Sequence, residues 1–549
     1  MKKAIKVISY VFGIFLAIIL SFVIYFKYGV TISEPNVQLP KMADKPVQEG
    51  NGYIYLENNW LRQSQSGLWE MYVEGTAIER GVAFGKLSNE LMHYQESVFV
   101  NQIRELVPSD AYLNTLKYLI RFYNRNITNY IPTEYQEEIY GTSLACSPEF
   151  NFIGSPYERQ LNYHAAHDLG HAMQDYMLVG CTSFAVWGSE SEDSTLIVGR
   201  NFDFYMGDDF ARNKLVAFYN PTQGYKFAMV GWAGMTGVLS GMNEKGLTVT
   251  INAAKSSMPS SSAMPISLLA RKILQYASNI QEAFLIADSA KTFVSESILI
   301  GSAKDKRAAI IEKSTEKTVL FTSQGNSIVC ANHYQSEAFK EDKKNLENIK
   351  TSDSPYRQKR AEELLFQNSP MNYWKAVDVL RDTRGLQDEH IGLGNEKALN
   401  QLIAHHSVVF MPESGLMWVS TGPWQLGQYV AYDLNKIFAG ADPSVEICEA
   451  ALTVPPDAFL TTSEYVNFLM FREVKKIFQR NIKEKISIPD STIYNFTQLN
   501  PNFYLVYDIA GDAFSLKKAQ DSAVFYWQKA LSLEIPKQGE REAIERKYK

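Results

Sequence analysis

Cysteine is scarce in this sequence, and neither sign of charge is in large excess. The 549 residues include four cysteines, and no two of them have the CxxC spacing that is typical of zinc knuckles. A disulfide framework is not indicated either, because such frameworks hold together much smaller scaffolds. Lys and Arg number 54 against 60 Asp and Glu, which gives a formal net charge of -6. Without a basic excess, nucleic acid is not expected as a partner.

Apolar residues make up 46% of the chain, so a large core and more than one domain are expected. Residues 7–26 carry no charge and, as a helix, are long enough to cross about 30 Å of hydrocarbon. Three lysines precede this run and only Lys27 follows closely, which predicts an N-terminus inside and the bulk of the chain outside. A cleaved signal peptide is the alternative, but no small-x-small cleavage pattern follows. We expect a single-pass membrane anchor in residues 1–30, with the bulk of the chain in the periplasm if the source is a bacterium.

Composition and periodicity divide the rest of the chain. Residues 31–69 contain several prolines and polar residues, which indicates a tether. Apolar residues at helical spacing predict mainly helices in residues 70–180. In residues 181–445, short alternating apolar runs and turn signals predict an antiparallel sheet, then helices, then further strands. This order favours an α+β fold in which two stacked sheets are flanked by helices.

The last segment, residues 446–549, has a different pattern. Six small or aromatic residues have the spacing of a tetratricopeptide repeat, namely Tyr507, Gly511, Phe514, Ala523, Trp527 and Ala530. Small residues let two helices approach each other, and aromatic rings fill the space between them. An ordinary helical hairpin packed on the core is the alternative. A repeat of this kind docks other proteins, so a non-catalytic interaction protein is one possible function for the chain.

Cys181 follows Gly180 directly and begins an expected strand in the run GCTSFAVWG. If the Gly180–Cys181 peptide bond is cut, Cys181 carries both a thiol and a free α-amine. An α-amine titrates near ~8, so part of it is neutral at working pH and accepts the thiol proton. Glycine before the cysteine hinders attack on its own carbonyl least. The pair predicts a self-processing cysteine nucleophile, although a buried structural cysteine is the commoner role for such a residue.

Arg200 and Asp203 lie on the next expected strand, in GRNFDF. With side chains alternating along a strand, Arg200 and Phe202 face one way while Asn201 and Asp203 face the other. A carboxylate would orient the cysteine amine, and a nearby cation would lower the pKa of the thiol. A surface ion pair that closes a hairpin is the alternative.

The runs GCTSFAVWG, GRNFDF and MNEKGLTVTINAAKS together resemble the family of penicillin acyltransferases and choloylglycine hydrolases. Further similar runs are VEGTAIERGVAFG at 73–85, ANHY around Asn332, SPYRQKR around Arg357 and HSVVFMPESGLMWVSTG. The likeness covers about residues 70 to 440 in the same order. It implies an N-terminal-nucleophile hydrolase with an αββα four-layer sandwich, in which residues 70–180 are the pro-segment and 181–445 the catalytic core.

The resemblance also implies residue roles. Cys181 would be the autoprocessing and catalytic nucleophile, with Arg200 and Asp203 beside it. Asn252 would hold the oxyanion, and Asn332 would be the second asparagine, near the amine of the nucleophile. Arg357 matches the later catalytic arginine, although the register leaves Arg360 as an alternative.

These roles predict an amidase or acyltransferase that cleaves the linear amide of an N-acylated amine through a thioester. Hydrolysis is favoured over transfer, because water is always present and no acceptor or coenzyme A motif is visible. No metal or organic cofactor is expected. The substrate would be a small molecule, and the expected membrane anchor suggests a lipid-like acyl group.

His164, His167 and His171 form a second cluster, in YHAAHDLGHAM. If this run is helical, all three lie on one face, in a spacing that zinc accepts. Packing or hydrogen-bonding roles are the commoner explanation. A zinc-dependent hydrolase built on these histidines, with Cys181 structural, is the remaining alternative.

Overall fold

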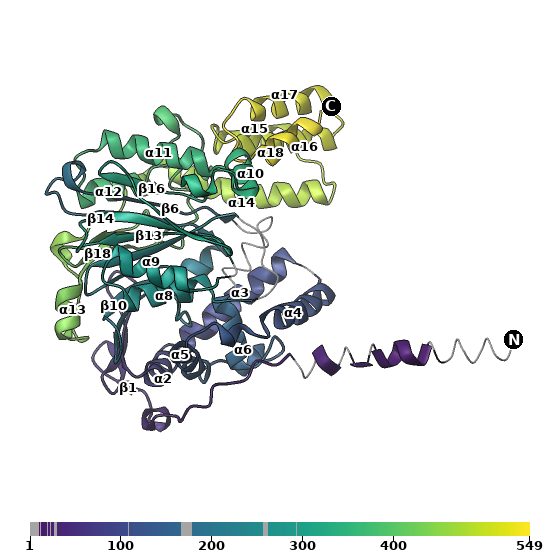
Figure 1. The fold of residues 1–549 in the computed structure, drawn as a ribbon. Coiled ribbons are helices and arrows are strands. Elements are labelled where there is room, and N and C mark those ends of the chain that lie inside the picture. Colours follow the sequence, from purple (N-terminus) through teal and green to yellow (C-terminus); the bar gives the residue numbers. More distant parts are fainter. Residues whose placement is uncertain are drawn as a thin grey trace.

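The computed structural model describes residues 10, 12–18, 20–21, 24–26, 30–107, 109–165, 178–255, 262–292 and 294–548. Two sheets, stacked face to face, form its centre (Figure 1). Helices cover the outer face of each sheet, so the order of layers is helix, sheet, sheet, helix. The expected α+β class is therefore confirmed.

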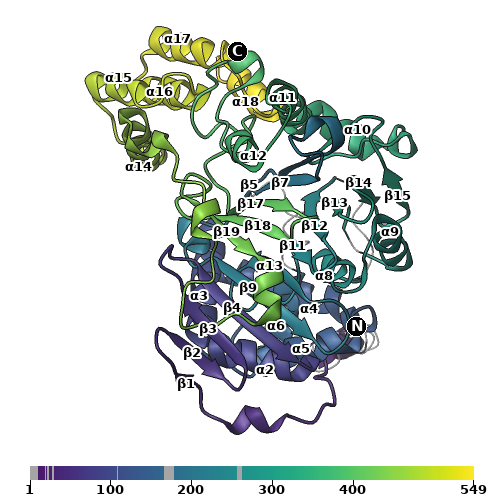
Figure 2. The same ribbon diagram turned by 90° about the vertical axis from the view of Figure 1, so that its left-hand side faces the viewer.

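Within the described residues, the larger sheet has eleven strands and is antiparallel except where β4 pairs with β9. In spatial order its strands are β1 (Gln48–Glu49), β2 (Tyr53–Leu56), β3 (Asn59–Gln63), β4 (Trp69–Gly75), β9 (Leu215–Pro221), β10 (Phe227–Gly231), β11 (Ser240–Asn243), β12 (Leu247–Ala253), β13 (Glu296–Ser302), β14 (Arg307–Lys313) and β15 (Thr318–Phe321). Chain from both sides of Cys181 thus contributes to one sheet, as the run of β1 to β4 into β9 shows in Figure 2.

The smaller sheet consists of β16 (Ser327–Cys330), β6 (Thr182–Val186), β7 (Ile197–Phe202), β17 (His406–Met411), β18 (Leu416–Ser420) and β19 (Tyr429–Asp433), all antiparallel. A short pair, β5 (Leu178–Val179) and β8 (Phe204–Tyr205), lies at the ends of β6 and β7. This arrangement places Cys181 at the start of β6, which lies between β16 and β7, and Arg200 on β7.

Successive side chains along each strand point to opposite faces of the sheet, and so contribute to two different cores. On β7, Val198 packs between the two sheets, whereas Ile197 faces the helices. The helices over the smaller sheet are α11 (Ser354–Gln367) and α12 (Tyr373–Leu380), with α10 (Lys343–Thr351) beside them. Their apolar residues form one core with β6, β7 and β17. Because both faces of these strands are buried, nearly every position on them carries an apolar residue.

On the other side, the larger sheet is covered by α2 (Ala77–Leu87), α5 (Thr133–Ser143), α8 (Ile266–Tyr276) and α9 (Ile280–Ser289). Helices α3 (Asn89–Leu106), α4 (Asp110–Asn124) and α6 (Pro156–His164) lie beside them, and α13 (Leu434–Gly440) follows β19. Helices α2 and α5 approach closely because Gly81 has no side chain. A Cβ there would lie 2.1 Å from the carbonyl oxygen of Glu138.

The segment before Cys181 differs from its expected form in two ways. Residues 31–69, which composition indicated as a tether, supply β1, β2 and β3, and Leu56, Trp60 and Leu61 in them are buried. Residues 70–180 hold β4 in addition to the expected helices. The apolar alternation in these short strands was obscured by the neighbouring prolines and polar residues.

The expected single-pass anchor, with its N-terminus inside and a periplasmic domain outside, is wrong. Among the described residues, no helix is both long enough and apolar enough to span a bilayer.

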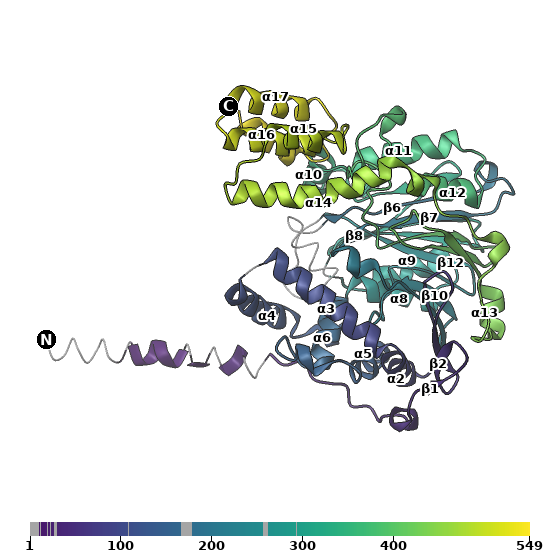
Figure 3. The same cartoon turned by 180° about the vertical axis from the view of Figure 1, so that it is seen from behind.

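The C-terminal region is helical, as expected. It comprises α14 (Ser463–Lys483), α15 (Asp490–Gln498), α16 (Tyr504–Leu516), α17 (Gln520–Leu531) and α18 (Gln538–Arg546), which share a core of their own. These helices gather at one end of the molecule, with α14 on the side of β8 (Figure 3). Arg472 of α14 donates a hydrogen bond to the Tyr205 hydroxyl at 3.0 Å. The assignment of α16 and α17 to a tetratricopeptide repeat stays a prediction.

Candidate active site

Cys181 lies between β5 and β6, only 1% exposed, where the two sheets and the β5–β8 pair meet. The N–H of the preceding residue, Gly180, donates to the backbone carbonyl of Asp203 at 3.1 Å. The carbonyl of Gly180 accepts a hydrogen bond from Nε2 of Gln401 at 2.9 Å. Both backbone polar groups of Gly180 are therefore hydrogen-bonded.

Arg200 contacts the thiol directly. Its Nη2 lies 3.6 Å from Sγ of Cys181, and its guanidinium lies over the Phe202 ring at 4.4 Å, so Arg200 and Phe202 share a side as expected. The same guanidinium donates to the Ser240 hydroxyl and to the carbonyls of Leu239 and Ile251. These contacts hold the cation in place.

Burial, rather than the arginine, dominates the acidity of the thiol. Desolvation raises the pKa of Cys181 to about 11, although Arg200 opposes the shift and Asp203 and Glu296 add to it. Arg200 lowers the pKa of the thiol, as expected, but burial raises it by more. In the intact chain the thiol is protonated at neutral pH, so a base has to remove its proton before it attacks.

Asp203 is buried and, within the described residues, neither carboxylate oxygen has a hydrogen-bond partner. Burial raises the pKa of this carboxyl to about 8, and the nearby Arg357 and Arg200 limit the rise. A buried carboxyl that titrates near neutral pH beside a protonated thiol is suited to accept and return a proton.

This shift predicts a pH-dependent stability. A carboxyl whose pKa is about 8 when folded and near 4 when unfolded holds a proton only in the folded state between these values, so stability falls as pH rises. The comparison uses a Cys181→Ala background, which keeps the chain uncut. In that background the free energy of unfolding is expected to fall by about 1 to 3 kcal/mol from pH 5 to pH 7, and Asp203→Asn is expected to abolish this fall. Urea unfolding of both proteins at each pH measures it. Parallel pH curves would show that Asp203 is ionised throughout.

Asn252 lies on β12 and faces the start of β6. Its Oδ1 accepts from the Ser183 hydroxyl at 2.6 Å, and its Nδ2 donates to the carbonyl of Cys330 at 2.9 Å. Ser183 is two residues from Cys181, so the amide is held near the thiol in a fixed rotamer. One of its two N–H groups is accounted for by the Cys330 carbonyl, which leaves the other as a donor.

Arg357 on α11 joins the remaining predicted residues. Its Nη1 donates to the backbone carbonyl of Cys181 at 2.7 Å and to the Thr182 hydroxyl at 2.8 Å. Its Nη2 donates to Oδ1 of Asn332 at 2.8 Å, and its Nε pairs with Asp353 at 2.8 Å. Asn332 in turn donates to the carbonyl of Ala253, next to Asn252.

The structure distinguishes the two arginines that sequence left open. Arg360 pairs with Asp382, Asp388 and Glu363, and Arg357 is the one that contacts Cys181. Cys181, Arg200, Asp203, Asn252, Asn332 and Arg357 thus form one connected cluster.

Sequence reasoning missed three polar residues near this cluster. Gln401 contacts Gly180, whereas Ser240 and His406 contact Arg200 and each other, with His406 Nε2 2.9 Å from the Ser240 hydroxyl. The adjacent histidines at 405 and 406, just before an apolar strand, were the available signal. Gln401 carried none, because it lies in a loop far along the chain.

The histidine cluster is only partly within the described residues, since His167 and His171 lie outside them. His164, at the end of α6, is buried with both ring nitrogens engaged. Nδ1 lies 2.7 Å from the carbonyl of Gln160, and Nε2 accepts from the N–H of Thr236 at 2.8 Å. Burial lowers the pKa of His164 to about 4. Its neutral ring serves hydrogen bonding and has no lone pair left for a metal.

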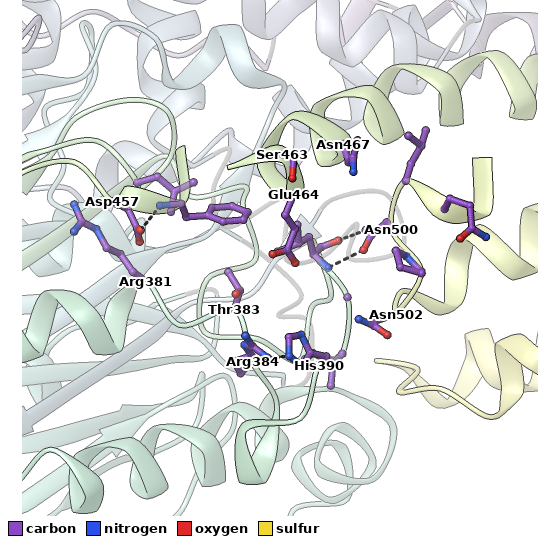
Figure 4. Close-up of a pocket in the computed structure, with 18 residues that line it drawn as sticks. Arg381, Thr383, Arg384, His390, Asp457, Ser463, Glu464, Asn467, Asn500 and Asn502 are labelled. Carbon is purple, nitrogen blue, oxygen red and sulfur yellow. Dashed lines mark hydrogen bonds between the residues drawn. The ribbon is translucent and has the colours of Figure 1, made fainter. Parts of the chain in front are cut away.

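Two cavities lie outside the cluster. One of about 360 Å³ separates loops of the core from α14 and the start of α16, and its polar lining includes Arg384, His390, Glu464 and Asn500 (Figure 4). None of the predicted site residues lines it. A smaller one of about 50 Å³ is mainly aromatic and is lined by Phe99, Phe204, Phe210, Trp232, Met235 and His164, among others. Phe204 places this second cavity next to Asp203.

Residues 189–422 match the family described as acyl-coenzyme A:6-aminopenicillanic acid acyl-transferase. The matched range is less than half of the chain and begins after Cys181. It contains Arg200, Asp203, Asn252, Asn332 and Arg357. The match supports the resemblance to penicillin acyltransferases.

The chain is also similar to an uncharacterized protein of Archaeoglobus fulgidus, with 25% identity over 273 residues, 46% of this chain and 44% of that protein. Protein dcd1B of Dictyostelium discoideum is 21% identical over 293 residues, 50% of this chain and 55% of that protein. The chain spans about half the length of the curated relatives it matches. A solved structure of the Caenorhabditis elegans N-acylethanolamine-hydrolyzing acid amidase ortholog matches with a TM-score of 0.32 and 16% identity, covering 42% of this chain and 93% of that one.

Proposed function

We propose that this chain is a self-processing cysteine amidase of the N-terminal-nucleophile class, with the αββα sandwich of that class. It would cleave the linear amide of a small N-acylated amine through a thioester on Cys181. The observation that carries the proposal is the cluster around Cys181. A thiol contacts one arginine, and the backbone carbonyl of the same residue accepts from a second arginine.

The reaction would begin with the cut between Gly180 and Cys181, which frees the α-amine of Cys181. That amine then accepts the thiol proton, and Sγ attacks the substrate carbonyl. Negative charge develops on the carbonyl oxygen, where the second N–H of Asn252 would donate. When the C–N bond breaks, the α-ammonium returns the proton to the leaving amine. Water then hydrolyses the thioester to a carboxylic acid and restores the thiol.

Arg200 and Arg357 would serve as fixed positive charges in this sequence. Arg200 stabilises the thiolate as it forms, and Arg357 holds the backbone carbonyl of the nucleophile. The cavity beside Asp203 would offer aromatic side chains to an acyl group, although Gln95, Glu96 and Gln160 also line it and its volume of about 50 Å³ admits only a small part of one. Hydrolysis is proposed rather than transfer, because water suffices to resolve the thioester.

Mass spectrometry of the purified protein under denaturing conditions tests the proposal. Two fragments are expected, the second beginning at Cys181, and incubation with an N-acyl amide should add the acyl mass to that fragment. An uncut chain that still turns over amides would contradict the mechanism.

A variant of Asn252 checks the oxyanion role. Asn252→Ala is expected to lower kcat by a factor of ~100 to 1000, because one preorganised donor to the developing charge is lost. Steady-state kinetics on cut protein measures the effect. Ser183→Ala is a milder variant for comparison, because it removes only the hydroxyl that orients the amide. It should lower kcat by a smaller factor. Wild-type kcat in Asn252→Ala would overturn the assignment.

A further inference from the structure

We propose that Gln401 is the oxyanion donor for the self-cleavage of the Gly180–Cys181 bond, a role separate from that of Asn252 in substrate turnover. The proposal rests on the proposed function, because it concerns the first step of the same mechanism. It concerns a residue in the loop that precedes β17, more than 200 positions from the bond that would be cut.

The contact already exists in the intact chain. Nε2 of Gln401 donates to the carbonyl oxygen of Gly180 at 2.9 Å, and that oxygen is the atom that becomes negatively charged when Sγ attacks. Gln401 is 3% exposed, so little water competes for the oxygen. A donor aimed at a developing charge in a dry site contributes far more than it would in water.

Gly180 is fitted to this donor. A Cβ at position 180 would lie 2.5 Å from Nε2 and 2.9 Å from Oε1 of Gln401, closer than real contacts allow. Any other residue would therefore push the Gln401 amide away from the carbonyl. The glycine before the nucleophile thus does more than reduce hindrance, because it makes room for a specific donor.

The loop that carries Gln401 is held on both sides. The Asn400 side chain accepts from the N–H of Leu402 at 3.0 Å and donates to the carbonyl of Arg381 at 3.2 Å. On the other side, Nδ2 of Asn201, on β7, donates to the carbonyl of Leu399 at 2.9 Å. Because these bonds fix the backbone around Gln401, its donor is in position before the reaction begins.

The cut proceeds as an acyl shift from nitrogen to sulfur. Asp203 in its ionised form takes the thiol proton as Sγ bonds to the carbonyl carbon of Gly180, and the oxyanion forms against Gln401. Breaking the C–N bond moves the acyl group to sulfur, and the released α-amine takes up the proton. Water then hydrolyses this thioester, which leaves Gly180 with a carboxylate and Cys181 with a free thiol. No oxidant or cofactor is consumed.

The test follows the cut in time. Wild-type, Gln401→Met, Gln401→Glu and Gln425→Met chains are made by pulsed translation, and the intact-mass ratio of cut to uncut chain is read at intervals. Methionine keeps the length and volume of glutamine without the donor. Gln425 is the matched control, because it is equally buried and donates to the carbonyl of Leu380 instead.

Both Gln401 variants are expected to be cut ~100 to 1000 times more slowly, and Gln425→Met within threefold of the wild type. Gly180→Ala should slow the cut as well, and adding Gln401→Met to it should slow the cut little further, since both remove one hydrogen bond. Wild-type cutting of Gln401→Met would overturn the role of Gln401 alone. A wild-type chain that is never cut would overturn the proposed function together with it.

Discussion

Replacing Cys181 by alanine is expected to leave a single uncut chain and to lower amide turnover by at least ~10⁴-fold. The same sulfur is required for both reactions, so both are lost together, and losses of this size are typical when a nucleophile is removed. Intact-mass spectrometry measures the first loss and release of the free amine measures the second. The side chain is small and buried, so the fold should survive with a cost of about 1 kcal/mol.

Cys330 provides the matched control for this variant. It is also buried and lies on β16, which pairs with β6, but its carbonyl rather than its thiol takes part in the cluster. Cys330→Ala should therefore be cut and should turn over substrate within a few-fold of the wild type. A cut Cys181→Ala chain would mean that another group, or another protein, severs the bond.

Replacing Arg357 by methionine is expected to slow the cut strongly and to destabilise the fold by about 3 to 5 kcal/mol. The guanidinium is 1% exposed and pairs with Asp353, so its loss leaves a buried carboxylate without its partner. It also removes the donor that holds the backbone carbonyl of Cys181 in place, so the thiol is positioned less well and the cut should slow by ~100-fold. Intact-mass time courses and urea unfolding in the Cys181→Ala background measure the two effects separately.

Arg360→Met is the control that separates a loss of stability from a loss of the cut. Arg360 is equally buried on the same helix and pairs with Asp382, so a comparable loss of stability is expected. Because its guanidinium pairs with Glu363, Asp382 and Asp388 rather than with Cys181, the remaining folded protein should be cut at close to the wild-type rate. Equal slowing by both variants would indicate that α11 acts only as a support.

The proximity of Cys181 and Arg200 could be predicted from the sequence because both lie on or beside strands with clear alternation. Arg200, in GRNFDF, falls opposite Ser183 in the antiparallel pair of β6 and β7, so local spacing was enough to place it near the thiol. Asn252, Asn332 and Arg357 depended on a resemblance, because nothing local relates residues from three distant segments.

Other features were outside the reach of sequence patterns. Gln401 has a function only through the path of a loop, and a loop path depends on tertiary hydrogen bonds such as that from Asn201 to Leu399. The strands in residues 48–63 were missed because they are two to five residues long, and short strands take their stability from the sheet they join. The membrane anchor was inferred from hydropathy alone, and no helix within the described residues bears it out.

If the Gly180–Cys181 bond is cut as proposed, the parallel pairing of β4 with β9 determines how the two products stay together. Strand β4 precedes the severed bond and β9 follows it, yet all seven residues of β4 are paired with β9 in one sheet. The two products therefore stay together as a heterodimer without a covalent link, and unfolding separates them. The molecularity of refolding changes from one to two, so the midpoint of unfolding of the mature protein should rise with protein concentration, while that of the uncut precursor should not.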